Sequence, residues 1–183
     1  MKPKKIKTID LVVIASLMAI EIILTRFLAF ETPLMRISFG FLPMAIMGIM
    51  YGPLWTGAAY VATDLLGMFA MPRAMFHPGF TLTALLSGVI YGFVLHNKVV
   101  TWPRVLVAAS LVSVFCNLVL DTIWLHQITG SAIMVLLPMR ILRTGIRIPL
   151  RTVLISLLWK RCAYMFAKIT GRQVLTLNNP AVI

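Results

Sequence analysis

Apolar runs long enough to cross a lipid bilayer are the dominant feature of this chain. Crossing the hydrocarbon core takes about 20 residues of helix. Of the 183 residues, 60% are hydrophobic and only five are acidic, which is a composition that a soluble domain rarely has. We therefore expect the bilayer to be the solvent. The five longest runs begin near Ile9, Pro53, Phe80, Val105 and Arg140.

A sixth apolar run, from Ile37 to Tyr51, is shorter. It ends at the Gly52-Pro53 break, where proline removes a backbone donor and glycine tolerates the turn. Six runs predict an all-α integral membrane protein, a bundle of six transmembrane helices that forms a single domain over residues 1–183. The predicted helices span about residues 8–30, 37–51, 54–70, 79–95, 103–127 and 140–168.

The lysines indicate the orientation of this bundle. An even number of spans places both ends of the chain on one side of the membrane, and both ends are basic. Cytoplasmic loops and ends carry an excess of lysine and arginine, so we expect both termini to be cytoplasmic. Every lysine then lies near the cytoplasmic face: Lys2, Lys4, Lys5, Lys7, Lys98, Lys160 and Lys168.

Arginines are distributed differently, because seven of them fall in the outer half. Those on the last helix are spaced by three, four and four residues, which keeps them within an arc of roughly 80°. The planar donor fork of arginine suits carboxylates and phosphates. Four acids near that half would leave a net charge of about +3, which an anion bound from outside would offset. The arginines are Arg26, Arg36, Arg73, Arg140, Arg143, Arg147 and Arg151, and the acids are Glu21, Glu31, Asp64 and Asp121.

Two of the acids, Asp64 and Asp121, are expected about six residues inside an outer helix end, at a depth of roughly 9 Å. A charged carboxylate at that depth is costly unless it faces protein, water or a partner. Either each acid pairs with an arginine and holds helices together, or it accepts two hydrogen bonds from the amidine-like edge of a heterocycle such as an aminopyrimidine. The residues alone leave both interpretations open.

Aromatic side chains near these acids are available to stack on a planar ligand. Trp124 lies three residues after Asp121 and shares its helix face. Asn117, four residues before Asp121, extends that face inward, where it would hydrogen-bond the ligand or another helix. Phe80 and His77 belong to the region of the second outer loop.

Motifs for energy conversion and catalysis are absent from the sequence. It has no Walker-type phosphate loop, no nucleophile elbow and no His/Cys cluster with metal-ligand spacing. We therefore predict no enzymatic activity, no metal, no cofactor and no nucleic-acid partner, and any energy required would come from another protein. Ala15 and Ala19 form a small-x-x-x-small pair that permits close approach of a partner helix or internal packing.

Four segments carry a resemblance to a known family: the Ala15/Ala19 pair, FHPGFTLTA at 76–84, NLVLDTIWL at 117–125 and PMR at 138–140. They resemble the membrane-embedded substrate-binding (S) components of energy-coupling factor vitamin transporters, in particular the folate-specific type. The similarity covers nearly the whole chain. The alanine pair is shared by many vitamin specificities, whereas the Pro-Gly-Phe-Thr-Leu and Leu-Asp-Thr-x-Trp-Leu runs look folate-type. This chain departs from the family pattern at His77, where the pattern has Phe.

The resemblance implies a six-helix bundle that binds its vitamin from outside, in a pocket covered by outer loops. It further implies docking, through the alanine face of the first helix, to a transmembrane coupling protein that carries two cytoplasmic ATPases. The docked component would then topple in the bilayer and release its ligand inside. Folate suits the residues, since it combines a pterin, an aromatic linker and a glutamate with two carboxylates.

Hypothetical roles for the candidate residues follow from this resemblance. Asp121 or Asp64 would hydrogen-bond the pterin edge of the ligand. Trp124 would stack on the pterin together with Phe80 or His77. The glutamate would be bound by one or more of four arginines: Arg26, Arg73, Arg140 and Arg147.

Three other interpretations stay possible from the sequence. An S component for another anionic vitamin would share the fold, the alanine face and the outer arginines. A self-sufficient small carrier would be expected to contain inverted repeats, which we do not find. An integral-membrane enzyme would need an acid–base or metal cluster near one interface, and the outer Asp, Arg and His residues could supply one. The expected location is the cell membrane, with several passes, in a bacterium.

Overall fold

Helices make up almost all of the described structure. The computed structural model describes residues 7–27, 30–31, 36–70, 77–130 and 133–170. Three elements, α5, the π-helix η1 and α6, follow one another without a break, and β1 pairs antiparallel with β2. The elements are α1 (Thr8–Arg26), β1 (Phe30–Glu31), β2 (Arg36–Ile37), α2 (Phe41–Tyr51), α3 (Pro53–Ala70), α4 (Pro78–Leu95), α5 (Trp102–Leu111), η1 (Val112–Leu120), α6 (Asp121–Thr129) and α7 (Ile133–Thr170).

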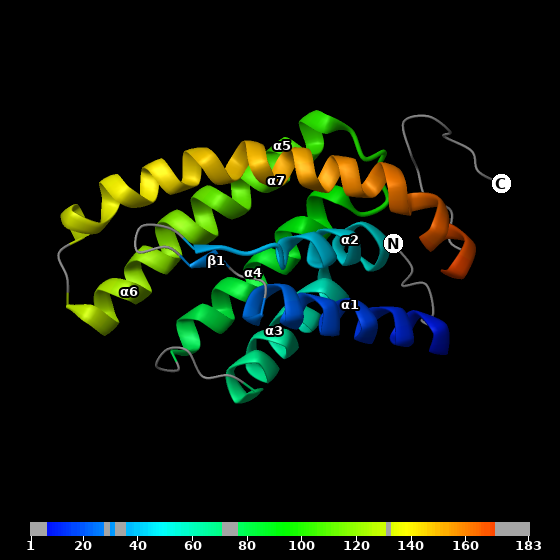
Figure 1. The fold of residues 1–183 in the computed structure, drawn as a ribbon, viewed down its shortest axis with the longest axis horizontal. Coiled ribbons are helices and arrows are strands. Elements are labelled where there is room, and N and C mark those ends of the chain that lie inside the picture. Colours follow the sequence, from blue (N-terminus) through cyan, green and yellow to red (C-terminus); the bar gives the residue numbers. More distant parts are fainter. Residues whose placement is uncertain (1–6, 28–29, 32–35, 71–76, 131–132, 171–183) are drawn as a thin grey trace.

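The first and last helices share an end of the bundle. Figure 1 shows that α1 begins and α7 ends on the right-hand side of the view, whereas α6 ends and α7 begins on the left. Within the described residues, three helical stretches have the length and apolar composition needed to cross a membrane: Thr8–Arg26, Pro78–Leu95 and Trp102–Ile128. The predicted all-helical, largely apolar fold is therefore confirmed at this level.

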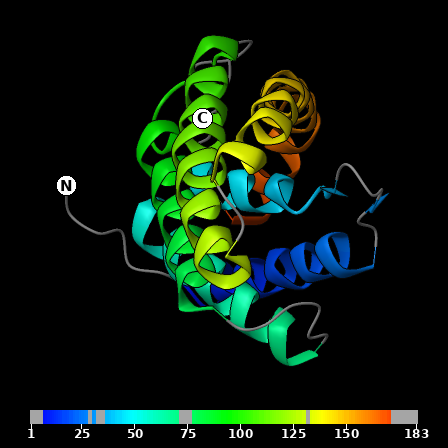
Figure 2. The same ribbon diagram turned by 90° about the vertical axis from the view of Figure 1, so that its left-hand side faces the viewer.

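α2 occupies the middle of the bundle. In Figure 2 it lies between α1 and α7, with the green helices on its other side. It contacts α1, α3, α4 and α7. Of its 11 residues, all except Leu42 are buried. A short helix that is apolar all round is stable only in such an enclosed position, which explains why this run stands apart from the longer ones.

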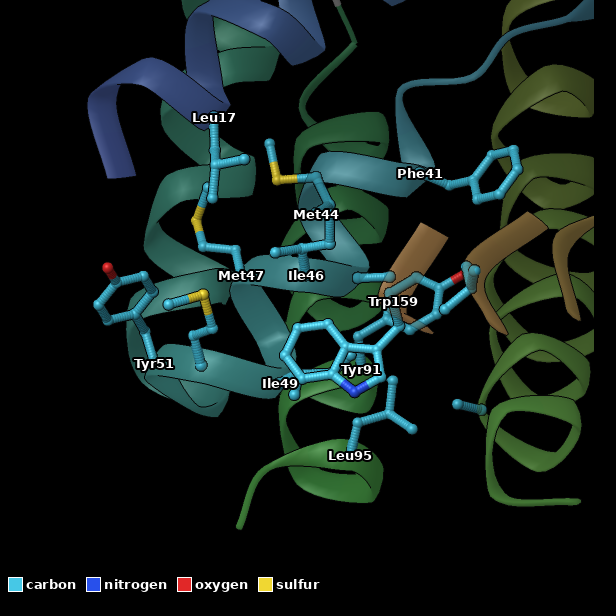
Figure 3. Packing of buried hydrophobic residues seen from close by; sticks show 14 of the residues in the cluster. Leu17, Phe41, Met44, Ile46, Met47, Ile49, Tyr51, Tyr91, Leu95 and Trp159 are labelled. Atoms are coloured by element: carbon cyan, nitrogen blue, oxygen red, sulfur yellow. The ribbon is translucent and has the colours of Figure 1, made fainter. Parts of the chain in front are cut away.

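The core forms around α2. Met44 and Met47 are both 0% exposed, and the flexible methionine side chain fills irregular gaps between helices. Figure 3 shows Leu17 of α1 on one side of these residues and Tyr91 of α4 on the other. Trp159 of α7 closes the same cluster at 2% exposure. The core therefore joins four helices that are far apart in the sequence.

α3 and α4 approach each other at the level of their backbones. A Cβ on Gly92 would lie 2.4 Å from Cα of Pro53, and a Cβ on Gly88 would lie 2.7 Å from the carbonyl oxygen of Thr56. Small residues allow this approach, which drives helix packing in membranes where the hydrophobic effect between helices is weak. The position of α4 is thus fixed against α3, and α4 carries several candidate site residues.

The structure differs from the predicted helix ends on both sides of the first loop. α1 ends at Arg26, not near Phe30, and α2 begins at Phe41, not at Ile37. The intervening residues Phe30–Glu31 and Arg36–Ile37 pair as two short strands, which satisfies backbone groups that a helix would otherwise bond. Pro33 stands between the strands in the sequence and disfavours helix on its N-terminal side.

The last helix also departs from its predicted start. α7 begins at Ile133, not near Arg140, and runs for 38 residues with Pro138 and Pro149 inside it. The prediction counted one bilayer thickness outward from Lys160. Helical hydrogen bonding does not stop at the membrane boundary, and at 1.5 Å per residue this helix is about 57 Å long.

Replacing Gly92 with alanine should force α3 and α4 apart, because the clash is with backbone atoms that cannot rotate away. Overpacking of this kind costs about 1–3 kcal/mol, so we expect a lower midpoint of thermal unfolding in detergent. Gly145→Ala is the matched control, since a Cβ at Gly145 meets nothing within 4 Å. Equal midpoints for the two variants would contradict the close approach.

Candidate ligand-binding site

Aromatic rings join the first turn of α4 to α6. His77 is the N-cap of α4, and its Nδ1 accepts a hydrogen bond from the backbone N–H of Gly79 over 3.1 Å. The centroid of the His77 ring lies 5.5 Å from that of Trp124 and 6.2 Å from that of Phe80. A Cβ on Gly79 would lie 2.3 Å from Cδ2 of Trp124, so the indole rests on the glycine backbone. The three predicted stacking residues therefore form one aromatic group.

A threonine hydroxyl of α4 hydrogen-bonds to this aromatic group. Thr83, 6% exposed, accepts a hydrogen bond from Nε1 of Trp124 over 3.1 Å. Its hydroxyl donates to the carbonyl oxygen of Gly79 over 3.1 Å. Thr83 is not among the residues predicted from the sequence. No spacing or charge in the sequence distinguishes it, because its bond to Trp124 depends on how α4 packs beside α6.

Arg140 bridges α7 to the junction of η1 and α6. Its Nη1 donates to the backbone carbonyl oxygen of Asn117 over 3.2 Å and to Oγ1 of Thr122 over 3.0 Å. Arg140 is also the cation that acts most strongly on the carboxyl group of Asp121. The side-chain amide of Asn117 donates to the carbonyl oxygen of Val112 over 3.1 Å. Asn117 therefore contributes its backbone to the cluster, while its side chain bonds within its own helix.

The π-helix η1 ends next to this bridge. At its end, the backbone N–H of Asp121 donates to a carbonyl oxygen five residues back, where an α-helix would use the fourth. Two carbonyl oxygens next to this junction accept side-chain hydrogen bonds: that of Asn117 from Arg140, and that of Leu118 from the hydroxyl of Thr122. Such π-segments are often found at functional sites. Apolar periodicity does not distinguish them from α-helix, so the sequence could not reveal η1.

Further arginines continue along the α7 face that carries Arg140. Arg147 is half-buried, and Asp121 is the acid that acts on it. Nε of Arg143 is buried and has no hydrogen-bond partner among the described residues. Among the described residues, Asp121 is an acid near both Arg140 and Arg147. This charge imbalance favours an anion as ligand.

Arg151 lies one turn deeper on the same helix. Its Nη1 donates to Oγ of Ser113 over 3.2 Å, and its guanidinium carbon lies 5.2 Å from the ring centroid of Phe41. A cation over an aromatic face is stabilised by the ring quadrupole. Arg151 therefore connects α7 to both η1 and α2. The sequence predicted only that Arg151 lies on the same face of the last helix as Arg140, Arg143 and Arg147.

Asp64 belongs to a second polar group, formed by α1, α3 and α4. Its Oδ2 accepts a hydrogen bond from Oγ1 of Thr81 over 2.9 Å. The carboxyl group of Glu21, on α1, is attracted by Arg26 and repelled by the carboxyl group of Asp64. A Cβ on Gly67 would lie 2.9 Å from Nε of Arg26, so this guanidinium lies against α3. The two predicted acids are therefore in different groups, each with its own threonine and arginine.

The other predicted residues lie apart from these groups. Ala15 and Ala19 are exposed on α1. Arg73 is outside the described residues. Within the described residues no three His, Cys, Asp or Glu side chains gather in a way that would hold a metal ion. Hydrogen-bond donors, acceptors and neighbouring aromatic rings are what the site offers chemically.

Apolar helices that gather arginines, a carboxylate and aromatic rings into one cluster define a membrane-embedded binding protein. Its family is identifiable from the sequence match: residues 10–159 match the ECF transporter, substrate-specific component family, and the chain belongs to it. The predicted family is thereby confirmed. Membership makes the chain a component of a transporter and a multi-pass protein of the bacterial cell membrane. The family is not known as a family of enzymes.

Relatives of known name are similar over most of the chain. The folate transporter FolT of Clostridium novyi (strain NT) is 41% identical over 150 residues, which are 82% of this chain and 87% of the relative. That of Leuconostoc mesenteroides is 35% identical over 130 residues, 70% of this chain and 69% of the relative. A crystal structure of FolT bound with folic acid matches with a TM-score of 0.79 at 34% identity, covering 85% of this chain and 95% of that one.

Replacing Gly79 with alanine should displace the indole of Trp124, because an aromatic ring cannot yield to a Cβ at 2.3 Å. We expect the emission of Trp124 to move to longer wavelength as the ring becomes more exposed to water. The measurement uses a variant in which the three other tryptophans are phenylalanine. Gly145→Ala in the same background should leave the spectrum unchanged, and an unchanged spectrum for Gly79→Ala would disprove the contact.

Proposed function

We propose that this chain is the high-affinity folate-binding component of an ECF-type ABC transporter. It captures folate, or a related pterin, from outside the cell and delivers it inward when docked to an ATP-driven module. The match over 85% of the chain to a FolT structure bound with folic acid is the observation that carries this proposal. Two relatives named as folate transporters support the same ligand.

The side-chain cluster suits such a ligand chemically. A pterin presents an amidine-like edge whose N–H donors would pair with the carboxylate of Asp121, beside the rings of Trp124 and His77. The hydrogen bond between Asp64 and Thr81 favours a structural role for that acid, which leaves Asp121 as the better candidate for the heterocycle. Phe80 completes the aromatic group.

The glutamate of folate carries two carboxylates, and arginine binds carboxylates through two parallel N–H donors. Arg140 and Arg147 share Asp121 as their nearby acid, so a second anion would stabilise both. Arg26 and Arg73 are the remaining candidates. Asn117 would contribute indirectly, since its carbonyl oxygen holds the guanidinium of Arg140.

The proposed topology is one domain, residues 1–183, with six transmembrane helices and both termini in the cytoplasm. The common end of α1 and α7 supports an even number of passes. Exposed basic residues lie near helix ends on the proposed cytoplasmic side, in agreement with the positive-inside tendency. They are Lys7, Lys98, Arg104, Lys160 and Arg161.

The proposed partners are a transmembrane coupling protein and the two cytoplasmic ATPases of an ECF module. Family membership supports a partner module of this kind. Ala15 and Ala19 are exposed on α1 and would let a partner helix approach closely. Both residues belong to α1, whereas the ligand cluster is formed by α4, η1, α6 and α7.

Purified chain should bind folate, and a co-purifying pterin should be visible in its absorbance spectrum.

Alanine in place of an arginine that binds the glutamate of folate removes a charge-assisted hydrogen bond. This change should weaken folate binding about 10- to 100-fold, measured by calorimetry. Arg104→Ala is the control, because this arginine is exposed and donates to the carbonyl oxygen of Val99. If none of four single alanine variants binds more weakly than the control, the carboxylate assignment is wrong. The four variants change Arg26, Arg73, Arg140 and Arg147.

Leucine in place of Ala15 or Ala19 should block assembly with the ECF module while leaving folate affinity unchanged, because the added bulk lies on the exposed face of α1. Co-purification with the coupling protein measures assembly. Ala58→Leu, a change at an exposed alanine of α3, should assemble normally. Normal assembly of both α1 variants would exclude this face as the docking surface.

A further inference from the structure

We propose that Arg140 is a positioning residue of the ligand site: its guanidinium holds the π-turn at the end of η1, and this turn sets the side of the helix on which Asp121 and Trp124 lie. The inference rests on the proposed function for its effect on folate affinity. Its structural content, the bond to Asn117 and the placement of Trp124, can be tested without any ligand.

One backbone carbonyl oxygen gives up its α-helical donor where η1 ends. In an α-helix, the N–H of Asp121 would donate to the carbonyl oxygen four residues back, which is that of Asn117. Here it donates instead to the carbonyl oxygen of Cys116. The oxygen that is passed over accepts from Nη1 of Arg140 over 3.2 Å. The guanidinium therefore supplies the donor that the π-turn takes away.

The same nitrogen also bonds the far side of the junction. Nη1 of Arg140 carries two hydrogens, and it donates to Oγ1 of Thr122 over 3.0 Å as well as to Asn117. Thr122 is 4% exposed, and its own hydroxyl hydrogen goes to the carbonyl oxygen of Leu118. One nitrogen of α7 thus connects the last turn of η1 to the first turn of α6.

Contacts with α7 show how the winding of this helix matters. Ser113, in η1, accepts a hydrogen bond from Arg151 over 3.2 Å. Thr122 lies nine residues later and accepts from Arg140. The two arginines are eleven residues apart, so they share one face of α7 to within about 20°. Residues nine apart in an α-helix would lie on opposite sides, at about 180°.

The π-helix removes this conflict. It takes up about one more residue per turn than an α-helix, so the nine residues of η1 make about two complete turns. Thr122 then returns to the side of Ser113. Trp124 meets α4 in the same arrangement, where its Nε1 donates to Oγ1 of Thr83 over 3.1 Å. A return to α-winding would rotate Asp121 and Trp124 by roughly 100° for each residue taken out of the wide turns.

This role of Arg140 differs from a direct contact with the glutamate of folate. A direct contact would affect only ligands that carry the glutamate. A positioning role also affects the pterin end, because Asp121 and Trp124 are the residues proposed to bind it. The two roles can therefore be separated by the choice of ligand.

Two variants remove the connection in different ways. Arg140→Met removes every donor of the side chain, and Thr122→Val removes one acceptor without changing any charge. Arg161→Met is the matched control for the first, because Arg161 is an exposed arginine of the same helix. Thr56→Val is the control for the second, since Thr56 is 0% exposed and donates to the carbonyl oxygen four residues back over 2.8 Å. All are full chains in detergent.

The first measurement reads the carbonyl group itself. Asn117 and Leu118 form the only Asn-Leu pair in the sequence. A chain labelled with ¹³C at the asparagine carbonyl carbons and with ¹⁵N at leucine therefore gives one correlation signal, that of the Asn117 carbonyl. Arg140→Met should move this signal, whereas Arg161→Met should leave it in place. An unmoved signal in Arg140→Met would overturn the proposal.

The second measurement reads the placement of Trp124. Four tryptophans give four indole N–H signals in a chain labelled with ¹⁵N-tryptophan, and Trp124→Phe identifies one of them. Arg140→Met and Thr122→Val should both move that signal, because the indole turns away from Thr83, while both controls should leave it unchanged. If either variant leaves it in place, Arg140 bonds the helix without positioning the site, and the proposal fails.

The third measurement compares dissociation constants for folic acid and for pteroic acid, which is folic acid without its glutamate. Arg140→Met should weaken both by a similar factor of about tenfold or more, and Thr122→Val should also weaken both. The double variant should bind little more weakly than Arg140→Met alone, because both changes break one connection.

A loss of affinity for folic acid with unchanged affinity for pteroic acid would indicate a direct contact with the glutamate and overturn the positioning role. If the unaltered chain binds neither ligand, the proposed function fails. The carbonyl and indole signals still decide in that case whether Arg140 positions Trp124.

Discussion

A hydroxyl, carboxyl or guanidinium group inside a bilayer must find its partner within the protein, because lipid tails offer none. Buried threonines meet this requirement by donating to a carbonyl oxygen one turn back, as Thr56, Thr63 and Thr152 do. Acids and arginines have no such local solution. Arg140 and Arg151 find partners across helices, in hydroxyls and a carbonyl oxygen of η1 and α6. The candidate site therefore lies where helix packing supplies polar partners.

The sequence alone allows predictions about residues that belong to one element. Trp124 and Asp121 are three residues apart, so helical periodicity alone places them on one face. Relations between helices were not accessible in this way. Thr83 meets Trp124 only because α4 packs beside α6, and its side chain has no unusual spacing or charge. The separation of Asp64 from Asp121 is likewise a property of packing, since the two acids are equivalent by depth and residue type.

Helix ends were the least predictable part of the fold. The expected start of α7 came from the thickness of the bilayer, but backbone hydrogen bonds continue past Pro138 to Ile133. The π-winding of η1 presents the same difficulty: the backbone N–H of Asp121 bonds to the carbonyl oxygen of Cys116, five residues back, and nothing in the apolar pattern indicates this. Apolar composition predicts that a segment is buried in lipid or protein. It does not determine which hydrogen-bonding ladder the segment adopts.

The proposed docking face and the ligand cluster are on different helices, and this constrains how one can affect the other. α1 exposes Ala15 and Ala19 while it buries Leu17. Among the described elements, α1 makes its main contacts with α2 and α3. A signal between the two faces would therefore pass through the enclosed helix α2 or through the contact of Arg26 with α3. Because α2 also packs against α4 and α7, a shift of α1 would reach the ligand cluster through a core that leaves little space for independent motion.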